Sequence, residues 1–425
     1  MKGKAVEVRD ASAKYTPQVD LSVVPEGYKQ TEVGVIPEGW EVSSVGQEFS
    51  VQLGKMLDSE RNTGEHKPYL SNRAVQWDRI DVSDLSTVPM TPSDLQKFRL
   101  KVGDILVCEG GEVGRAAIWN APLDECYYQK ALHRLRPLKG FNCKLMVAVL
   151  RRWADKGVLN DYVTQTSIAH LPRDKFLTIL IPVPPEREQR AIATALSDVD
   201  AQLKALDRLI AKKRDLKQAA MQQLLPGQTR LPGFEGEWEV KQLGDLAQIV
   251  MGQSPNSTNY NSRGEGLPLI QGNADIRERK TIKRVFTTQI TKHGRAGDIL
   301  MSVRAPVGEI SRATFDVCLG RGVCALRAAN NCIYHYLIYL EPSWAKHSKG
   351  STFDSVSSAD IRTVEVPLPS DPNEQSAIAN VLSDMDSELE ALEQRRAKTA
   401  VLKQAMMQEL LTGRTRLMQP ENADG

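Results

Sequence analysis

The chain has 425 residues, which is long enough for two or three domains with sizeable cores. Hydrophobic residues make up 41% of it and charged residues 25%, which is typical of a globular protein and argues against wholesale disorder. Its 55 basic and 53 acidic residues nearly cancel, so any positive potential that attracts nucleic acid must be local.

The six cysteines show neither a CxxC pair nor the CxxC…HxxxH spacing of a zinc site, which predicts reduced thiols and no bound metal. No apolar run approaches the ~20 residues of a membrane span, and the polar start MKGKAVEVRD lacks the apolar core of a signal peptide. We therefore expect a cytoplasmic protein with no membrane partner. Residues 1–30 are expected to form a flexible lead-in to the first domain.

Two tryptophan-centred segments open the two halves of the chain. A shift of 198 residues superimposes Trp40 on Trp238 and Gly54 on Gly252. After each opening, short apolar runs alternate with Gly, Pro, Asn and Asp, the pattern of short strands and turns. The strands that we expect cover residues 104–108, 177–183, 298–302 and 363–368.

Other landmarks also match between the halves. GDILVCEGGEVG at residues 103–114 corresponds to GDILMSVRAPVG at 297–308, and PYLSNRA at 68–74 corresponds to PLIQGNA at 268–274. The segments between these landmarks share little. A duplication that keeps its scaffold glycines while its loops diverge predicts two like-folded domains with different ligands.

The most similar part of the duplication is a long helix that closes each half. A shift of 186 residues aligns 188–231 with 374–417, and 26 of the 44 aligned positions are identical. In the second copy Asp371 is a predicted N-cap, with Glu374 placed as a capping-box acid. Gly227 and Gly413 are the expected C-terminal caps.

Apolar residues recur in both helices at alternating spacings of four and three, which is typical of a coiled-coil seam. Farther along, the apolar stripe is expected to shift to Leu216, Ala220 and Leu224, mirrored by Leu402, Met406 and Leu410. About 40 helical residues give a rod of ~60 Å, and antiparallel pairing of two such rods would bury both seams. The alternative is that each helix packs only on its own domain. The predicted seam residues are Ile192, Leu196, Val199, Leu203, Leu206, Ile378, Leu382, Met385, Leu389 and Leu392.

The predicted fold class is α+β, with two similar mixed α/β domains separated by an antiparallel coiled coil of two long helices in a pseudo-two-fold internal repeat. The first domain should cover residues 31–185, followed by the first helix at 186–227. The second domain should cover 228–370, followed by the second helix at 371–414 and a tail at 415–425.

Motifs that carry catalysis are missing from the sequence. There is no Walker A motif, no strand-linked GxGxxG, no GxSxG elbow and no HExxH. The glycines at 109–114 resemble a phosphate-binding loop, but the counterpart at 303–308 lacks two of them, so a tight turn explains them better. His133 and His170 are expected to be structural or contact residues. No catalytic residue is assigned.

The divergent loops contain Arg, Lys, Asn, Gln, Ser and Tyr, whose side chains can reach phosphates and base edges. Each of them alone is more often a solvated surface residue, so the prediction rests on the set. The candidates in the first half are Lys55, Asn72, Arg73, Trp77, Arg79, Arg115, Tyr128, Gln129, Lys130, Gln165, Thr166, Ser167 and His170. The candidates in the second half are Gln253, Ser254, Asn261, Gln271, Asn273, Arg277, Arg304, Arg321, Lys349, Ser351 and Thr352.

The order of variable domain, helix, variable domain and helix resembles the specificity subunit of type I restriction–modification systems. The motifs that match are Pro184-Pro185 with Glu188-Gln189 at the first helix, LLTGRTRL at 410–417, and the lead-in at 24–40. The likeness covers nearly the whole chain. One departure is that the second helix is entered through Ser370-Asp371-Pro372 instead of Pro-Pro, which affects capping rather than function.

The resemblance implies that the two domains are target recognition domains, each of which reads one half of an asymmetric, bipartite DNA sequence. The helix pair would set the spacer and dock two modification subunits and the restriction (motor-nuclease) subunits. S-adenosylmethionine, ATP and Mg would bind those partners, with no cofactor on this chain, which would itself be non-catalytic. The rival interpretation is a coiled-coil scaffold whose terminal domains bind protein partners. A nuclease with a degenerate acidic site is a weaker alternative.

Overall fold

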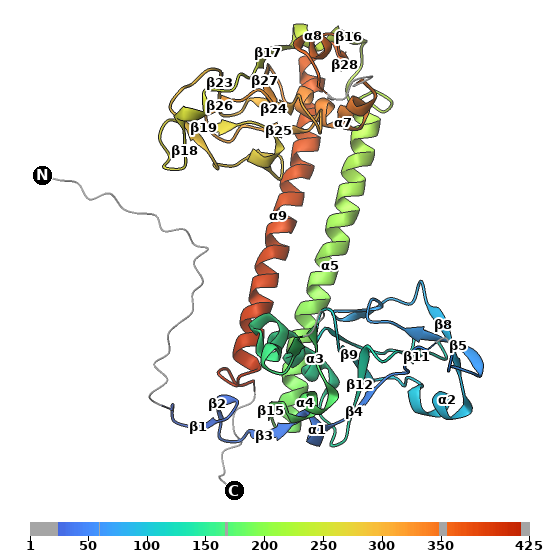
Figure 1. Ribbon diagram of the computed structural model, residues 1–425. Helices are drawn as coiled ribbons and strands as arrows, with labels where there is room; N and C mark the ends of the chain where they lie inside the picture. The colour runs from blue at the N-terminus through green and yellow to red at the C-terminus, as the bar shows by residue number, and fades with distance from the viewer. Residues whose placement is uncertain (1–23, 59, 166–168, 348–354, 418–425) are drawn as a thin grey trace, which may run out of the picture. The chain divides into compact units, whose positions relative to one another are not determined.

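The computed structural model describes residues 24–58, 60–165, 169–347 and 355–417 (Figure 1). The chain divides into two compact units. Unit 1 consists of Met1–Lys204 with Lys398–Gly425, and unit 2 consists of Ala205–Ala397. Each unit contains one mixed α/β domain together with a segment of each of the two long helices, α5 (Glu186–Leu224) and α9 (Pro372–Leu410).

The domain of unit 1 is built on two small sheets. In the first, β12 (Leu132–Pro137) lies between β4 (Phe49–Leu53) and β9 (Ile105–Cys108), and β10 (Ala116–Ile118) is at the edge. In the second, β5 (Glu65–Leu70) lies between β11 (Tyr127–Tyr128) and β8 (Ser86–Met90). The other elements of this domain are β1 (Tyr28–Thr31), β2 (Gly34–Pro37), β3 (Glu41–Ser44), α1 (Val45–Glu48), β6 (Val75–Gln76), β7 (Arg79–Ile80), α2 (Pro92–Phe98), α3 (Cys143–Lys156), η1 (Val158–Asp161), β13 (Thr164–Gln165), β14 (Ala169–His170), α4 (Arg173–Thr178) and β15 (Leu180–Val183).

The core of unit 1 lies between the first sheet, α3 and the long helices. Asn142 caps α3 by accepting from two backbone amides, and Gly157 ends it in the left-handed conformation. Trp40 is 1% exposed and packs in one cluster with residues of α3, with Ile192 and Leu196 of α5 and with Leu410 of α9. Burial of such side chains stabilises the unit by about 1.5–3 kcal/mol each, so the helix segments are part of this core.

The domain of unit 2 repeats this plan. In its larger sheet β27 (Val323–Ala328) lies between β17 (Ala247–Met251) and β24 (Ile299–Ser302), as β12 lies between β4 and β9. The other sheet has the order β18-β22-β19-β26-β23. The further elements are β16 (Trp238–Gln242), α6 (Leu243–Leu246), η2 (Ser257–Asn259), β18 (Tyr260–Asn261), β19 (Leu267–Ile270), η3 (Asn273–Asp275), β20 (Ile276–Arg277), β21 (Lys280–Thr281), β22 (Phe286–Thr287), β23 (His293–Gly294), β25 (Ile310–Arg312), β26 (Val317–Leu319), α7 (Cys332–His347), α8 (Ser358–Arg362) and β28 (Glu365–Pro369).

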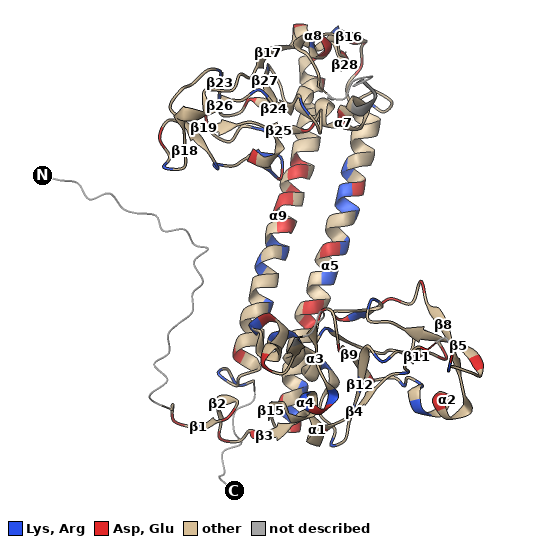
Figure 2. Cartoon of the chain, in the orientation of Figure 1, with Lys and Arg blue, Asp and Glu red and all other residues tan. Residues whose placement is uncertain are grey.

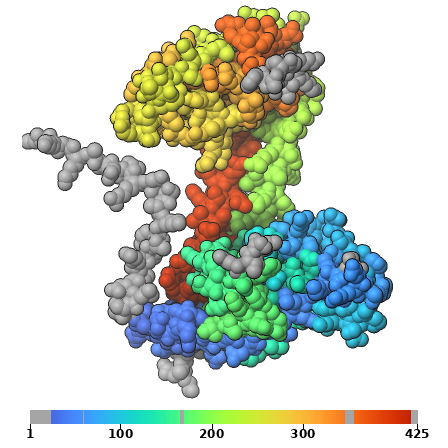
Figure 3. All heavy atoms as spheres, in the orientation of Figure 1, coloured from blue at the N-terminus to red at the C-terminus, as the bar shows by residue number. Residues whose placement is uncertain are grey.

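The core of unit 2 is formed in the same way as that of unit 1. Ile378 and Leu382 of α9 and Met221 of α5 pack in one cluster with residues of α7 and the larger sheet. The space-filling view shows the yellow and orange domain seated directly on the red segment of α9 within this unit (Figure 3). The duplicated helix starts therefore have equivalent packing roles, because each contributes apolar side chains to the core of its own unit.

Duplicated charged residues fix the starts of the long helices. In unit 1 the Glu188 carboxylate, 2% exposed, accepts hydrogen bonds from Arg416 at 2.6 and 2.8 Å. In unit 2 the fully buried Glu374 carboxylate accepts from Arg230 Nε at 2.9 Å and from its Nη2. The start of one helix is thus joined, inside each unit, to the segment that follows the end of the other. This arrangement makes the α5 and α9 segments antiparallel in both units.

The helix caps agree with the sequence pattern except at one residue. Asp371 accepts a hydrogen bond from the Asn373 amide at 2.8 Å, as an N-cap does. Gly227 and Gly413 have φ of 73° and 68°, the left-handed conformation expected of C-terminal caps. Glu374 is expected to close a capping box, but its carboxylate instead accepts hydrogen bonds from Arg230. A fully buried carboxylate without a charged partner would be strongly destabilising, whereas an unfilled capping position at a helix end costs less.

The predicted seam residues lie in several environments. Ile192, Leu196, Ile378 and Leu382 are buried in the domain cores, so each helix start packs on its own domain and, inside its unit, beside the end of the other helix. Leu206 and Leu389 are buried as well, while Val199, Leu203, Met385 and Leu392 are half-buried, with Met385 packed against the core of unit 2.

The predicted continuation of the apolar stripe is correct at Leu224 and Leu410, which are buried, and at Ala220 and Met406, which are half-buried against the cores. It is wrong at Leu216, which is 46% exposed, and at Leu402, which is 55% exposed. The inward positions are occupied by Lys217 and its repeat equivalent Lys403. Lys217 is paired with Asp386 in unit 2, and Lys403 is paired with Asp200 at 2.6 Å in unit 1. A charged residue in a helix seam favours one register, because any other register would leave its charge without a partner.

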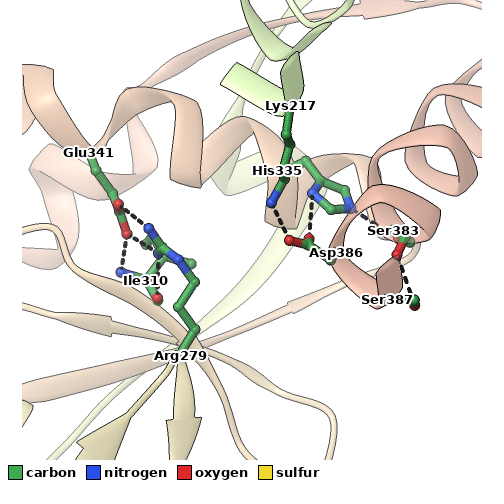
Figure 4. Close-up of polar contacts among 8 residues, drawn as sticks. All are labelled: Lys217, Arg279, Ile310, His335, Glu341, Ser383, Asp386 and Ser387. Atoms are coloured by element: carbon green, nitrogen blue, oxygen red, sulfur yellow. Dashed lines mark hydrogen bonds and ion pairs between the residues drawn. The ribbon is translucent and has the colours of Figure 1, made fainter. Parts of the chain in front are cut away.

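In unit 2 a larger polar network surrounds Lys217. Basic residues of α5 face acidic residues of α9, as the blue and red segments show (Figure 2). In His335 of α7, Nδ1 lies 3.9 Å from the Asp386 carboxylate, too far for a hydrogen bond, and Nε2 bonds the Ser383 hydroxyl at 3.0 Å (Figure 4). Arg279 donates to both oxygens of Glu341, which also accepts from the Ile310 amide at 2.7 Å. The β20–β21 hairpin is thereby fixed to α7.

The structure confirms the predicted fold class of two similar mixed α/β domains with two long antiparallel helices. The strand expected at 177–183 begins only at Leu180, because Arg173–Thr178 forms α4. Helices inside the domains, above all α3 and α7, were not identified from the sequence. No described helix is both long and apolar enough to cross a membrane.

Candidate nucleic-acid interface

Five segments of the first domain converge at the ends of β4, β9 and β12, and we call them loop cluster 1. They are residues 54–55, 70–72, 109–115, 129–132 and 170. Backbone hydrogen bonds join them: the Lys130 amide donates to Lys55 at 2.8 Å, Gln129 to Leu70 at 3.1 Å and Glu109 to Ala131 at 2.9 Å. Gly110 pairs with His170 in an isolated bridge.

The second domain brings the equivalent segments together, and we call them loop cluster 2. They are residues 252–254, 270–273, 303–308, 320–323 and 355. The Gly252 amide donates to Val323 at 3.0 Å, Gly320 to Ile270 at 2.8 Å and Val303 to Gly322 at 2.9 Å. Arg304 pairs with Ser355 as Gly110 pairs with His170.

The two clusters share their backbone and differ in their side chains. At the equivalent positions, cluster 1 has Lys55, Gly110 and His170 where cluster 2 has Gln253, Arg304 and Ser355. Close approach of the chain explains the shared glycines. A Cβ at Gly54 would lie 2.3 Å from the Tyr128 oxygen, and one at Gly252 would lie 2.1 Å from the Gly320 oxygen. A rigid common scaffold with variable side chains is the arrangement needed to present different contacts in the same geometry.

Several candidate residues of the first domain already have partners. The Lys55 ammonium is paired with Asp94 at 2.7 Å. Arg115 is held by Glu112 at 2.7 Å and by the Asn72 carbonyl at 2.9 Å, so it supports the loop and links two segments of the cluster. Trp77 donates to the same Glu112 at 3.1 Å. These residues shape loop cluster 1 more than they offer free charge.

Tyr128 is a wrong prediction. Its ring is fully buried, where it packs edge-on against Phe98 and beneath Arg134. Burial raises the pKa of its hydroxyl well above the usual range. The flanking Gln129 and Lys130 emerge from this anchored tyrosine, with Gln129 half-buried and Lys130 exposed. Arg73 and Arg79 are also exposed, Arg73 next to Asn72 of the cluster and Arg79 on β7.

In the second domain the candidates divide between the loop cluster and neighbouring elements. Gln253, Ser254, Gln271, Asn273, Arg304 and Arg321 belong to loop cluster 2. Asn261 is instead used inside its own loop, where its side chain accepts from the Arg263 and Glu265 amides. Arg277 is exposed on β20, outside the cluster.

Six of the predicted contact residues fall wholly or partly outside the described part of the chain. The Gln165 side chain and all of Thr166, Ser167, Lys349, Ser351 and Thr352 lie outside the described residues. In the part of the chain that is described, the sequence missed Glu109 and Ser355. Glu109 lies 3.5 Å from His170 Nδ1, and Ser355 pairs with Arg304. The landmark that contains Glu109 could have pointed to it, whereas nothing in the sequence marks Ser355.

The buried histidines have structural surroundings. His133 bonds the Leu171 carbonyl at 2.9 Å and packs on Phe176, and burial lowers its pKa to about 4. Burial likewise lowers the pKa of His335 to about 4. Among the described side chains, no group of three or more His, Cys, Asp or Glu residues is arranged to hold a metal ion.

Comparison with known proteins connects this architecture to a family. The family model for the type I restriction modification DNA specificity domain matches residues 37–212 and 235–401. A Methanocaldococcus jannaschii protein that carries the name type I restriction enzyme MjaX specificity subunit is 29% identical over 362 residues, covering 80% of this chain and 85% of its own.

Solved structures agree with the sequence relatives. A chain from a study of complex assembly and conformational transition of the type I R-M system is 26% identical, with a TM-score of 0.59, and the match covers 89% of this chain and 99% of that one. The type I restriction-modification S subunit from M. genitalium shares the fold, with a TM-score of 0.58 at 18% identity, covering 87% of this chain and 96% of its own. Together these matches define a class of DNA specificity subunits built from two domains and long helices.

The chain belongs to the family of type I restriction–modification DNA specificity subunits, because the family model matches both of its halves. The resemblance read from the duplicated motifs is thereby confirmed.

Proposed function

We propose that each domain of this specificity subunit contacts one half of an asymmetric, bipartite DNA target through its own loop cluster. The observation that carries the proposal is the pair of clusters, in which the same backbone hydrogen bonds hold different side chains. Sequence is read by side chains at base edges, whereas a shared backbone frame fixes where those side chains are presented.

The helix pair is proposed to set the separation of the two half-sites. Each helix has 39 residues, so each is ~60 Å long at ~1.5 Å per residue, which is longer than the ~34–36 Å of one DNA turn. The pairs of Lys217 with Asp386 and of Lys403 with Asp200 favour a single helix register in each unit, as a device that sets spacing requires.

The family membership supports assembly with other restriction–modification subunits and with DNA. We propose that two modification subunits and the restriction subunits dock on the helices, and that S-adenosylmethionine, ATP and Mg bind those partners and not this chain. The chain would then act without catalysis of its own, in the cytoplasm where its DNA target is. The sequence supports this division of labour, since it contains none of the nucleotide-binding or hydrolase motifs.

A salt titration of DNA binding tests the proposal against the protein-scaffold alternative. The subunit is assembled with its modification subunits. Its affinity for a DNA duplex that carries the sequence methylated by the system is measured between about 50 and 200 mM salt. A DNA reader that contacts phosphates loses affinity steeply over this range. Binding that is absent or independent of salt would contradict the proposal and favour a scaffold for protein partners.

A further inference from the structure

A basic residue occupies the same turn position in both loop clusters. Leu132 donates to the Gln129 carbonyl at 3.0 Å, which closes a four-residue turn with Lys130 at its second position. In the other domain Val323 donates to the Gly320 carbonyl at 3.2 Å, and Arg321 has the second position of that turn. Sequence alignment alone does not match these two residues, because the segments around them have diverged.

Neighbouring segments hold both turns in place. The Lys130 amide donates to the Lys55 carbonyl at 2.8 Å, and the Arg321 amide donates to the Ser254 hydroxyl at 3.2 Å. The residue after each cation accepts a 2.9 Å hydrogen bond from the third segment, from Glu109 in one case and Val303 in the other. Hydrogen bonds to two other segments therefore fix the backbone of Lys130 and of Arg321. This reduces the conformational entropy that is lost when the side chain binds a ligand.

Both side chains are exposed. Within the described residues no acidic side chain pairs with either of them, in contrast to Lys55 and Arg115 of the same region. An exposed, unneutralised cation on a rigid turn is suited to a phosphate or to an acceptor at a base edge.

We infer that Lys130 and Arg321 are equivalent DNA-contacting residues, one for each half of the target. The inference rests on the proposed function and adds to it the residue through which each domain makes a charge-assisted contact. Arg321 can make a two-pronged hydrogen bond to a guanine edge or a phosphate, whereas Lys130 supplies a single point charge. The exchange of lysine for arginine at one structural position is therefore a means of giving the two half-sites different requirements.

The repeat also supplies matched controls. Lys101 and Arg295 are a second equivalent lysine and arginine, both exposed, and each is the first residue of a turn. The Lys101 amide donates to the Asp104 carboxylate at 2.8 Å, and the Arg295 amide donates to the Asp298 carboxylate at 2.9 Å. These turns precede β9 and β24, whereas the loop clusters follow those strands. Alanine at these positions removes the same charges from the other end of the same strands.

The test uses the subunit assembled with its modification subunits, on the duplex whose methylated sequence is found by sequencing DNA from cells that carry the system. Lys130→Ala and Arg321→Ala are expected to lower affinity by about 5- to 100-fold, because one base or phosphate contact is lost. Lys101→Ala and Arg295→Ala should stay within about two-fold of the parent. Hydroxyl-radical footprinting should show lost protection in one half of the target for Lys130→Ala and in the other half for Arg321→Ala.

The outcomes separate the inference from the function on which it rests. If the parent complex binds its target and the two cluster variants bind as well as the control variants, the inference is overturned and the proposed function stands. If both cluster variants lose protection in the same half, the inference is overturned as well. If the parent complex shows no salt-dependent binding to its target, the proposed function itself fails.

Discussion

The ion pair between Arg416 and Glu188 gives a stability prediction that can be worked from the structure. The Glu188 carboxylate is 2% exposed and accepts from Arg416 at 2.6 and 2.8 Å and from Trp40 Nε1 at 2.8 Å. Arg416→Ala leaves this buried carboxylate with the indole as its only remaining donor among those three bonds. Breaking a buried pair costs about 3–5 kcal/mol, and because Trp40 stays bonded we expect about 3 kcal/mol.

The reciprocal change should cost less. Glu188→Gln leaves Arg416 without a carboxylate, but that side chain is 27% exposed and water can solvate it, so we expect about 1–2 kcal/mol. The double variant should be more stable than Arg416→Ala alone, because it no longer contains an unpaired buried charge.

Hydrogen exchange of the amides in residues 186–204 measures these free energies inside unit 1 of the full chain. Arg230→Ala, which breaks the equivalent pair in unit 2, is the control and should leave exchange in unit 1 unchanged. The reasoning is refuted if Glu188→Gln costs as much as Arg416→Ala, or if the double variant is less stable than Arg416→Ala alone.

Three further predictions follow from the helices, the buried histidines and the absence of catalytic motifs. Inserting four residues beside Lys212 adds ~6 Å to one helix, so the recognised spacer should lengthen by about one or two base pairs with both half-sites unchanged; sequencing of methylated sites checks this, and an unaltered spacer counts against a spacing role. His133 has a pKa of about 4 when folded and 6.5 ordinarily, so unit 1 should lose stability as pH falls from 6.5 to 4. His133→Gln should flatten that dependence in hydrogen-exchange measurements, and an unchanged slope would assign it to other groups. The purified chain with Mg²⁺ should leave plasmid DNA uncut on a gel, and cleavage that survives repurification would contradict a non-catalytic subunit.

The sequence predicted the structure best at residues whose local conformation depends on their own backbone preference or polarity. Gly227 and Gly413 were identified as caps because a left-handed helix end favours glycine, and both adopt that conformation. The two-domain α+β architecture followed from the duplication. Even the unpredicted helix α3 left local signals, with Asn142 before it and Gly157 after it.

What the sequence could not predict depends on partners far away in the chain. Lys217 looks like a surface residue, yet it is 9% exposed because Asp386 neutralises it from the other helix. Lys55 and Lys130 are both lysines in loop cluster 1, and only the fold shows that the first is paired with Asp94. Tyr128 was indistinguishable from a contact residue until its burial against Phe98 was seen.

The central claim is that each domain reads one half of the target. Its most direct test is to replace residues 41–180 by the corresponding segment of another family member and to sequence the methylated sites in cells that carry the exchanged subunit with its modification subunits. The account predicts a new sequence in one half-site, with the other half-site unaltered. A change in both half-sites, or in neither, would contradict it.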